Sequence, residues 1–540
     1  MTPIEALLEI LRDEGVTKIF GNPGTTELPL LDALARTPDL EYVLAVQEAS
    51  AVAMADGYAR VTGRPAFVNL HVAAGLANGL IGLLNARRSR TPLVVTAGQQ
   101  DRRHLLEDPM LGGDLVGIAQ SATKQAVEVQ HARDLPVVLR RAFALAARPP
   151  AGPVFVGIPM DLLREDVEVE VPPRAPVPPR GPAAGLAEAA RLLASAERPA
   201  IVAGDGVGRD DAVAELVALA ERLDATVFHH PMHDRLNFPF SHPLHAGMIA
   251  PRNAAVRESL AGHDVVFVVG AHAFSPHHYT PGSPIPPGTR VVQLDEDPAE
   301  PGRNFPVALG LVGDVKASLA ELVARTGSVE RSSRAGGATT RDVPATVDVP
   351  STVDMPATVD VPDAVGVPLE PVVAARAIAD GLPPDAVVLD EAITVGVLLR
   401  PLLRLDRPGS FAHTVGGGLG WGFGGAVGTR MAQDRPVVAV LGDGCAMFGL
   451  QGLWSAARYR VPVLFLVMNN GEYRTLKDTL GEFYGPGPHP GIELGRLDWT
   501  KAAEFFRVAA RRVTSDADLR VLVASAGSLT APLLVDVPLR

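Results

Sequence analysis

The sequence predicts an α/β fold of three domains, each built on a mainly parallel, doubly wound sheet. Short β-branched runs alternate with stretches of helical apolar spacing along the 540 residues, as in strand–helix–strand units. That length exceeds what one hydrophobic core usually serves and corresponds to about three domains. The expected divisions are a first domain at 1–170, a linker at 171–183, a middle domain at 184–325, a second linker at 326–364 and a last domain at 365–540.

Polar residues follow the expected strands of the first domain. The carboxyl ends of parallel strands are where α/β proteins carry their chemistry. The loop 21–26, with the sequence GNPGTT, follows the first strand, and an amphipathic helix begins near Glu27. Strands are expected at 16–20, 42–46 and 66–70, and the polar residues that follow them are Asn22, Glu48 and His71. An isolated Glu48 would be interpreted more simply as a first-turn helix acid favoured by the dipole.

Two linkers are indicated by proline. The segment 171–182 contains PPRAPVPPRGP, an extended spacer that no helix or central strand accepts. The second linker holds a short repeat that starts with Asp-Val-Pro or a close variant at Asp342, Asp348, Asp354 and Asp360. This segment has few aromatic residues, and it cannot bury enough surface to offset the conformational entropy lost on ordering. We therefore expect a disordered linker. A β-solenoid is the weaker alternative, because its prolines would stack poorly.

The middle domain carries a glycine run without a known fingerprint. Strands are expected at 264–270 and 289–295. The run 204–208, GDGVG, lacks the glycine spacing of a dinucleotide-binding loop, so we expect no FAD or NAD there.

The last domain contains the most informative stretch of the chain. Strands are expected at 437–441 and 461–468, joined by a Gly-Asp-Gly turn at 442–444 and a helix at 448–459. Parallel crossovers are right-handed, so Asp443 and Asn470 should lie side by side at one edge of the sheet. With a backbone carbonyl at Glu472, their oxygens suit Mg²⁺, while Gly442 and Gly444 let backbone N–H groups approach a phosphate. A structural turn without a cofactor is the alternative.

Composition limits the partners of the chain. The formal net charge of −12 argues against nucleic acid or an anionic membrane as a partner. No apolar run approaches the ~20 residues of a membrane helix, and no secretory signal is evident, so we expect a cytoplasmic protein. The single cysteine, Cys445, excludes an internal disulfide and a cysteine metal cluster.

Several segments together resemble the thiamine diphosphate-dependent 2-keto acid decarboxylases, and the benzoylformate decarboxylases among them. They are GDG followed by Asn469-Asn470, with GNPGTTELPLLDAL, VLAVQEASAVAMADGYAR and FVNLHVAAGLANGL near the amino terminus. The resemblance covers nearly the whole chain outside the repeat. It implies pyrimidine-binding, middle and diphosphate-binding domains in that order, thiamine diphosphate and Mg²⁺ as cofactors, and a homodimer or homotetramer with the active site between subunits. Acetolactate synthases, which use the middle domain for FAD, are related, so FAD remains open on this ground.

The resemblance implies roles for particular residues around the cofactor. Glu48 would hydrogen-bond the aminopyrimidine and favour its imino tautomer, and the carbonyl of Gly417 would accept from its amino group. Leu419 would be the bulky side chain that bends the cofactor. Gly442, Asp443, Gly444 and Asn470 would hold the diphosphate, with Asp443, Asn470 and Glu472 at the metal. Asn22, Pro23 and Asn78 match further residues around cofactor and substrate.

The resemblance also implies an acid–base pair and a substrate pocket. His71 and His277 would move protons, although His278 is adjacent and the register could slip by one. Thr25 stands where the benzoylformate decarboxylases have a serine that contacts the substrate carboxylate. His413 and Thr479 replace two aromatic pocket residues, and Leu476 is retained. We expect Arg474 and Lys477 to be solvated helix residues rather than to face an acidic 2-keto acid.

The expected function is therefore non-oxidative decarboxylation of a 2-keto acid, benzoylformate or a related compound, to an aldehyde and CO₂. The thiazolium ring of the cofactor supplies the electron sink that this chemistry needs. One alternative is a carboligase of the acetolactate synthase type, which couples two carbonyl compounds. Another is a catalytically silent protein that binds thiamine diphosphate, against which the intact Glu48, His71, Asp443 and Asn470 argue.

Overall fold

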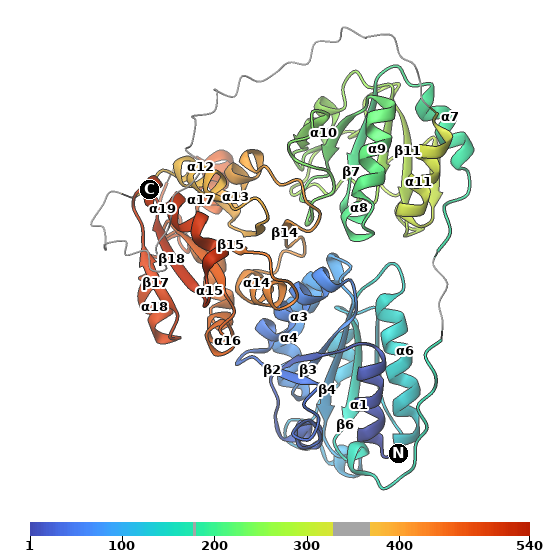
Figure 1. The fold of residues 1–540 in the computed structure, drawn as a ribbon, viewed down its shortest axis with the longest axis vertical. Coiled ribbons are helices and arrows are strands. Elements are labelled where there is room, and N and C mark those ends of the chain that lie inside the picture. Colours follow the sequence, from blue (N-terminus) through green and yellow to red (C-terminus); the bar gives the residue numbers. More distant parts are fainter. Residues whose placement is uncertain (176–179, 328–367, 486) are drawn as a thin grey trace.

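Three six-stranded parallel sheets form the chain, and the predicted fold class is confirmed (Figure 1). The computed structural model describes residues 1–175, 180–327, 368–485 and 487–540. The repeat at Asp342 to Asp360, and the predicted disordered linker from residue 328 onward, lie outside the described residues. In the described part, no helix is both long enough and apolar enough to cross a membrane.

The first sheet has the strand order β2-β1-β3-β4-β6-β5, so the chain winds outward from the β1/β3 pair in both directions. Its strands are β1 (Lys18–Gly21), β2 (Glu41–Leu44), β3 (Ala66–Leu70), β4 (Leu93–Gln99), β5 (Gln125–Glu128) and β6 (Val154–Pro159). Its helices are α1 (Pro3–Asp13), α2 (Leu28–Leu34), α3 (Glu48–Thr62), α4 (Val72–Arg88), α5 (Leu115–Gln120) and α6 (Leu135–Ala147). The predicted strands at 16–20 and 42–46 are shifted by one or two residues, because ladder hydrogen bonds rather than apolar content set a strand's ends.

The middle sheet has the order β12-β11-β10-β7-β8-β9. Its strands are β7 (Pro199–Ala203), β8 (Thr226–His229), β9 (His245–Met248), β10 (Val265–Val269), β11 (Arg290–Asp295) and β12 (Leu309–Val312). Its helices are α7 (Leu186–Ala194), α8 (Asp205–Arg209), α9 (Val213–Leu223), α10 (Asn253–Ser259) and α11 (Val315–Arg325). The glycine run after β7 packs against the end of β10: a Cβ on Gly204 would lie 2.4 Å from Ala271, and one on Gly206 would lie 2.7 Å from the Gly270 Cα.

The third sheet has the order β14-β13-β15-β16-β18-β17. Its strands are β13 (Val387–Glu391), β14 (Phe411–His413), β15 (Val437–Gly442), β16 (Val463–Asn469), β17 (Ala509–Arg512) and β18 (Leu533–Pro538). Its helices are α12 (Pro371–Gly381), α13 (Ile393–Leu399), α14 (Trp421–Met431), α15 (Asp443–Gly449), α16 (Gly452–Arg458), α17 (Arg474–Tyr484), α18 (Trp499–Phe505) and α19 (Asp516–Ala524).

One helix of the third domain begins earlier in the structure than the sequence predicts. The helix expected at 448–459 is two helices, and the first of them, α15, begins at Asp443 directly after β15. Its buried residues Gly444, Cys445 and Ala446 are small, so they carry no periodic signal of large apolar side chains. β15 and β16 pair in parallel, with Gly442 opposite Met468, as the predicted strand–helix–strand unit requires.

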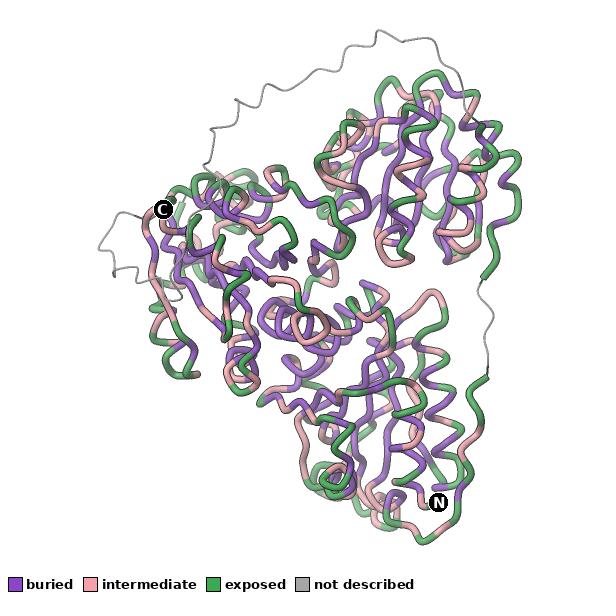
Figure 2. The backbone as a smooth tube through the Cα atoms, viewed as in Figure 1, coloured by how far each residue is buried: buried purple, intermediate pink, exposed green. Residues whose placement is uncertain are grey.

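The first and third domains pack through α3 and α14, which lie side by side at the centre of the molecule (Figure 1). Glycines allow the close approach: a Cβ on Gly57 would lie 2.1 Å from the Gly425 carbonyl oxygen, and one on Gly428 would lie 1.8 Å from that of Met54. Buried residues fill the central strands of every sheet and this helix pair (Figure 2).

Arg60 of α3 joins all three domains. Its side chain is only 5% exposed and lies 2.9 Å from the Asp56 carboxylate and 3.5 Å from that of Asp234 in the middle domain. It donates to the His413 carbonyl oxygen of the third domain at 2.9 Å. The Trp421 indole N–H donates to Asp56 at 2.6 Å, and its ring lies 5.0 Å from the guanidinium. A buried polar network therefore fixes how the domains meet.

Candidate active site

Glu48 is held by two amides at the amino end of α3. Asn22, in the loop after β1, donates its Nδ2 to Oε1 at 3.0 Å, and Asn78 of α4 donates its Nδ2 to Oε2 at 3.1 Å. The glutamate is 7% exposed, and a Cβ on Gly75 would lie 3.1 Å from Oε1. Three residues that the sequence placed in one site are thus brought together, with the carboxylate fixed by neutral donors.

His71, which follows β3, contacts a carboxylate that the sequence interpretation missed. Its Nδ1 lies 2.8 Å from Glu27 Oε2 and 3.1 Å from the Thr26 hydroxyl oxygen. Glu27 is 2% exposed, and it also accepts from the backbone N–H groups of Gly24 and Gly98, each at 2.9 Å. The sequence signal that could have identified Glu27 is an acidic residue at the end of a polar loop that contains glycine. The Nδ1 of His71 is therefore engaged within the protein, which leaves Nε2 for chemistry.

The rest of the loop before Glu27 is partly open. Asn22 and Pro23 are half-buried, and Thr25 is exposed. Gly24 is required here, because a Cβ at this position would lie 2.3 Å from the His71 ring.

Asp443 and Asn470 lie at the ends of neighbouring strands, as predicted. Asp443 Oδ1 accepts from the Gly444 N–H at 2.8 Å, and Oδ2 accepts from the Gly471 N–H at 2.7 Å. Asn470 Oδ1 accepts from the Glu472 N–H at 3.0 Å. Backbone N–H groups of the turn after β16 therefore hold both polar side chains.

This group fits a magnesium ion. Asp443 is 4% exposed, burial raises its pKa, and no Lys, Arg or His of the described residues pairs with it within 4.0 Å. A buried carboxylate without a cation is compensated when a metal ion binds. The described residues hold no cluster of three His, Cys, Asp or Glu side chains suited to a metal, and a site of one carboxylate, one amide oxygen and one carbonyl needs none.

Glu472 is paired on both sides. Its Oε1 binds Arg474 Nε, and its Oε2 binds Lys477 Nζ at 2.6 Å. Arg474 and Lys477 lie on α17, half-buried and exposed respectively, as expected for solvated helix residues, and each is also paired with the Glu472 carboxylate, which is itself 7% exposed.

The loop 415–420 is anchored by Glu391, a second residue that the sequence interpretation missed. This residue ends β13, is 1% exposed and accepts the N–H groups of Gly420 and Trp421 at 2.9 Å and of Gly422 at 2.8 Å. Burial raises the pKa of its carboxyl group to about 7. Gly417 has a φ of +79° and is exposed, and Leu419 is half-buried.

Apart from Thr25 and His71, the predicted substrate residues fall into two places. His277 lies in an exposed loop with its Nδ1 3.0 Å from His278 Nε2, and the His278 ring centroid lies 6.3 Å from that of Phe483 in α17. Leu476 and Thr479, on the same helix, are exposed and half-buried respectively. His413 instead is 3% exposed at the domain junction, with its Nδ1 2.7 Å from the Asp390 carbonyl oxygen. Burial lowers its pKa to about 4, and its role in the pocket stays a prediction.

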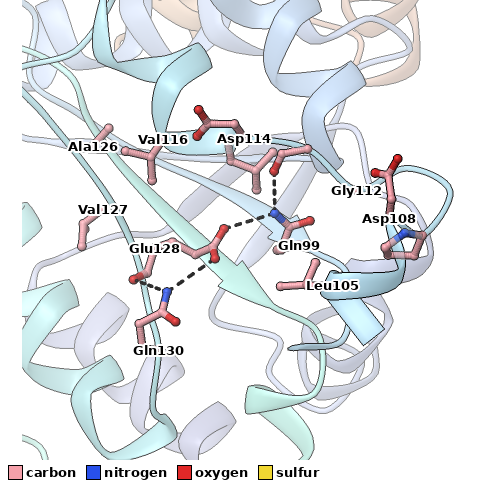
Figure 3. A pocket seen from close by; sticks show the side chains of 13 residues that line it. Gln99, Leu105, Asp108, Gly112, Asp114, Val116, Ala126, Val127, Glu128 and Gln130 are labelled. Atoms are coloured by element: carbon pink, nitrogen blue, oxygen red, sulfur yellow. Dashed lines mark hydrogen bonds between the residues drawn. The ribbon is translucent and has the colours of Figure 1, made fainter. Parts of the chain in front are cut away.

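A separate cavity of about 660 Å³ lies at the carboxyl edge of the first sheet (Figure 3). Gln99, which ends β4, donates its Nε2 to the Gly113 carbonyl at 2.8 Å and to Glu128 at 3.2 Å across its wall. The cavity is close to the start of α4, which directly follows His71, because a Cβ on Gly113 would lie 2.8 Å from that of Ala73. None of the predicted site residues lines it.

Comparison with known proteins matches three successive parts of the chain to one family. The thiamine pyrophosphate enzyme family matches through its N-terminal TPP-binding domain at residues 1–128, its central domain at 186–322 and its C-terminal TPP-binding domain at 395–537. Benzoylformate decarboxylase of Pseudomonas aeruginosa is 34% identical over 99% of this chain and 98% of its own.

Other relatives extend the comparison. The solved structure of a thiamine diphosphate-dependent 4-hydroxybenzoylformate decarboxylase from Rhodococcus jostii RHA1 has a TM-score of 0.90 and 32% identity, covering 100% of this chain and 99% of that one. The acetolactate synthase large subunit of Haemophilus influenzae is 27% identical over 98% of this chain and 93% of its own. On these matches and the geometry above, the chain belongs to the thiamine pyrophosphate enzyme family.

Proposed function

We propose that this protein catalyses the non-oxidative decarboxylation of an aromatic 2-keto acid, benzoylformate or a ring-substituted relative, to the aldehyde and CO₂. The observation that carries the proposal is the Glu48 carboxylate, held between Asn22 and Asn78 in a chain similar along its whole length to benzoylformate decarboxylases. Thiamine diphosphate and Mg²⁺ are the proposed cofactors.

We assign the residues of the site to the parts of the cofactor that they would hold. Asp443, Asn470 and the Glu472 carbonyl would hold Mg²⁺, and Gly442 and Gly444 would border the diphosphate. Glu48, the Gly417 carbonyl and Leu419 would hold the aminopyrimidine. When bound, the thiazolium ring supplies the electron sink for the loss of CO₂.

Proton movement is assigned to two histidines. Because Glu27 engages Nδ1 of His71, Nε2 is the nitrogen that faces the substrate and holds or accepts a proton there. His277 provides the second proton position from the exposed loop of the middle domain, and Thr25 contacts the substrate carboxylate. Protonation by this pair favours aldehyde release over coupling to a second carbonyl compound.

The complete site is proposed to form between two subunits of a homodimer or homotetramer. Within one chain, no hydrogen bond or ion pair among the described residues joins the Glu48 cluster to the Asp443 group. Large apolar side chains of the first and third domains are exposed, as expected for a surface that a partner covers. They include Leu106, Met110, Phe448, Phe483 and Tyr484. Light scattering that gives a monomer with full activity would contradict this part of the proposal.

Several features narrow the range of expected substrates and cofactors. Arg474 and Lys477 are engaged by Glu472, which favours a neutral side chain on the keto acid over an acidic one. His413 and Thr479 stand in place of two aromatic pocket residues, so ring substituents are the expected source of selectivity. The close packing of Gly204 and Gly206 on the end of β10 supports an enzyme without FAD. A cytoplasmic location fits the single, buried cysteine.

The proposal is tested by product analysis. Purified protein with thiamine diphosphate and Mg²⁺ is given benzoylformate, 4-hydroxybenzoylformate, a branched-chain keto acid and pyruvate, and CO₂ and the organic product are measured. We expect benzaldehyde or its hydroxy derivative as the main product, lost in Glu48→Gln. Coupled products in excess of aldehyde would favour the acetolactate synthase type of reaction, and cofactor binding without turnover of any acid would favour the silent protein.

A further inference from the structure

The loop 415–420 is held against α4 of its own chain by one side chain. Asn85, near the carboxyl end of α4, donates its Nδ2 to the Gly418 carbonyl oxygen at 2.8 Å. In return, the Gly418 N–H donates to Asn85 Oδ1 at 3.0 Å. Only one orientation of the amide satisfies both bonds. Asn85 is 2% exposed, so the pair is protected from water.

The fit leaves no room for a side chain at Gly416 or at Gly418. A Cβ on Gly416 would lie 2.3 Å from Asn85 Oδ1, and one on Gly418 would lie 2.7 Å from the Ile81 side chain. Gly417, between them, has a φ of +79°, a left-handed conformation that glycine adopts without strain. The three consecutive glycines are therefore explained by the close packing of the loop against α4 and by the left-handed conformation at Gly417.

We infer that Asn85 is a positioning residue of the active site, because its amide fixes both peptide groups of Gly418 and thereby places the Gly417 carbonyl and the Leu419 side chain. This inference rests on the proposed function, which assigns those two groups to the aminopyrimidine. Glu391 holds the next anchor point at Gly420, so the segment that faces the cofactor is fixed on both sides.

The same helix supports Glu48. Asn78 and Asn85 are two turns apart on one face of α4, about 10 Å along its axis. Asn78 donates to Glu48, and Asn85 binds the loop of the same chain. In the proposed dimer, Glu48 works with the loop of the partner subunit, so Asn78 and Asn85 of one helix serve different active sites.

The first experiment measures the loop and the cofactor separately. We expect Asn85→Ala to increase hydrogen exchange of the peptide containing Gly418 in the protein without cofactor, and to weaken thiamine diphosphate binding, followed by fluorescence titration, by about tenfold or more. Thr123→Val is the matched control, because it removes one buried hydrogen bond of the same domain, to the Ala119 carbonyl at 2.9 Å, without touching the loop.

Asn85→Asp distinguishes a positioning role of Asn85 from a merely structural one. A protonated aspartic acid can donate to the Gly418 carbonyl, whereas the ionised form places two acceptors face to face. We expect its cofactor affinity, relative to wild type at the same pH, to recover on acidification from about pH 8 to about pH 5.5. Unchanged cofactor affinity in folded Asn85→Ala, whatever the exchange result, would overturn the inference.

The second experiment uses mixed dimers. A heterodimer of one Glu48→Gln chain and one Asn85→Ala chain places both defects in one site and leaves the other intact, so we expect about half of the wild-type activity. Absence of recovery would show that Asn85 acts in the same site as Glu48 of its own chain, and would overturn the inference. Wild-type protein that turns over no keto acid would refute the proposed function instead, while the exchange and affinity measurements still test Asn85.

Discussion

At the scale of single residues, the contact between Glu27 and His71 decides what the histidine can do. The carboxylate is buried, accepts two backbone N–H groups, and lies 2.8 Å from Nδ1 of the imidazole. A carboxylate in this position fixes the ring orientation and the tautomer, and it stabilises the imidazole when Nε2 takes up a proton. Glu27 is thus a positioning residue for His71 in the proposed reaction.

Glu27→Gln should lower kcat/KM for the 2-keto acid by about 10- to 100-fold, because a charge-assisted hydrogen bond is worth about 1.5–3 kcal/mol. The amide oxygen can still accept one backbone N–H, so we expect the fold and cofactor affinity to persist. Steady-state kinetics and far-ultraviolet circular dichroism make the comparison. Glu27→Asp, which retains the charge, should recover part of the loss, and activity within twofold of wild type in Glu27→Gln would refute this role.

At the scale of elements, the end of β13 and the start of α14 are joined by the Glu391 carboxyl group. Three backbone N–H groups at the beginning of the helix point to it. These bonds favour the charged form, but burial dominates and raises its pKa from 4.5 to about 7. The carboxyl group therefore links the stability of this element to pH.

The sign of that linkage follows from the direction of the shift. A pKa that is higher in the folded state contributes stability that is fully present below pH 4.5, is lost as the pH rises toward 7, and changes no further above it. Glu391→Gln removes this loss, so the stability of the variant relative to wild type should rise between about pH 5 and about pH 7. Urea unfolding midpoints of the cofactor-free protein measure it.

A matched control for Glu391→Gln is Glu258→Gln, which changes an exposed carboxyl group of α10. Its difference from wild type should stay constant over the same pH range. A pH-independent difference for Glu391→Gln as well would show that the carboxyl group titrates alike in the folded and unfolded states, contrary to this prediction.

At the scale of the whole molecule, the Arg60 network holds three domains in one arrangement. One guanidinium compensates Asp56 of the first domain and Asp234 of the middle domain, and it binds a carbonyl of the third. Buried ion pairs contribute little beyond what hydrophobic residues would, but breaking one leaves a charge uncompensated. The network therefore specifies how the domains meet more than it adds to stability.

Arg60→Met should destabilise the protein by about 3–5 kcal/mol, because buried Asp56 loses its ion-pair partner and buried Asp234 keeps only Arg235, at 3.6 Å, while the side-chain volume is nearly kept. Thermal and urea unfolding report the change. The exposed Arg64, in the same domain, provides Arg64→Met as a control, for which a change within about 0.5 kcal/mol is expected. A loss for Arg60→Met no larger than the control's would mean that the junction does not depend on this charge.

Much of the fold could be predicted because it depends on local periodicity and a handedness rule. Apolar runs placed β3, β10, β11 and β15 within one residue of their observed ends. Right-handed crossovers then put Asp443 and Asn470 at one edge, and that prediction is confirmed. The start of α15 was missed because its small buried residues carry no periodic apolar signal.

The sequence by itself determined the three α/β domains, the strand ends that carry Glu48, His71 and Asp443, and the family. Only the tertiary structure decided which distant groups touch them: Glu27 on His71, Glu391 at the start of α14, and Asn85 on Gly418. The physical reason is that strand and helix patterns repeat over a few residues, whereas these hydrogen bonds depend on how whole elements pack. Pairs separated by up to 333 positions leave no local trace in the chain.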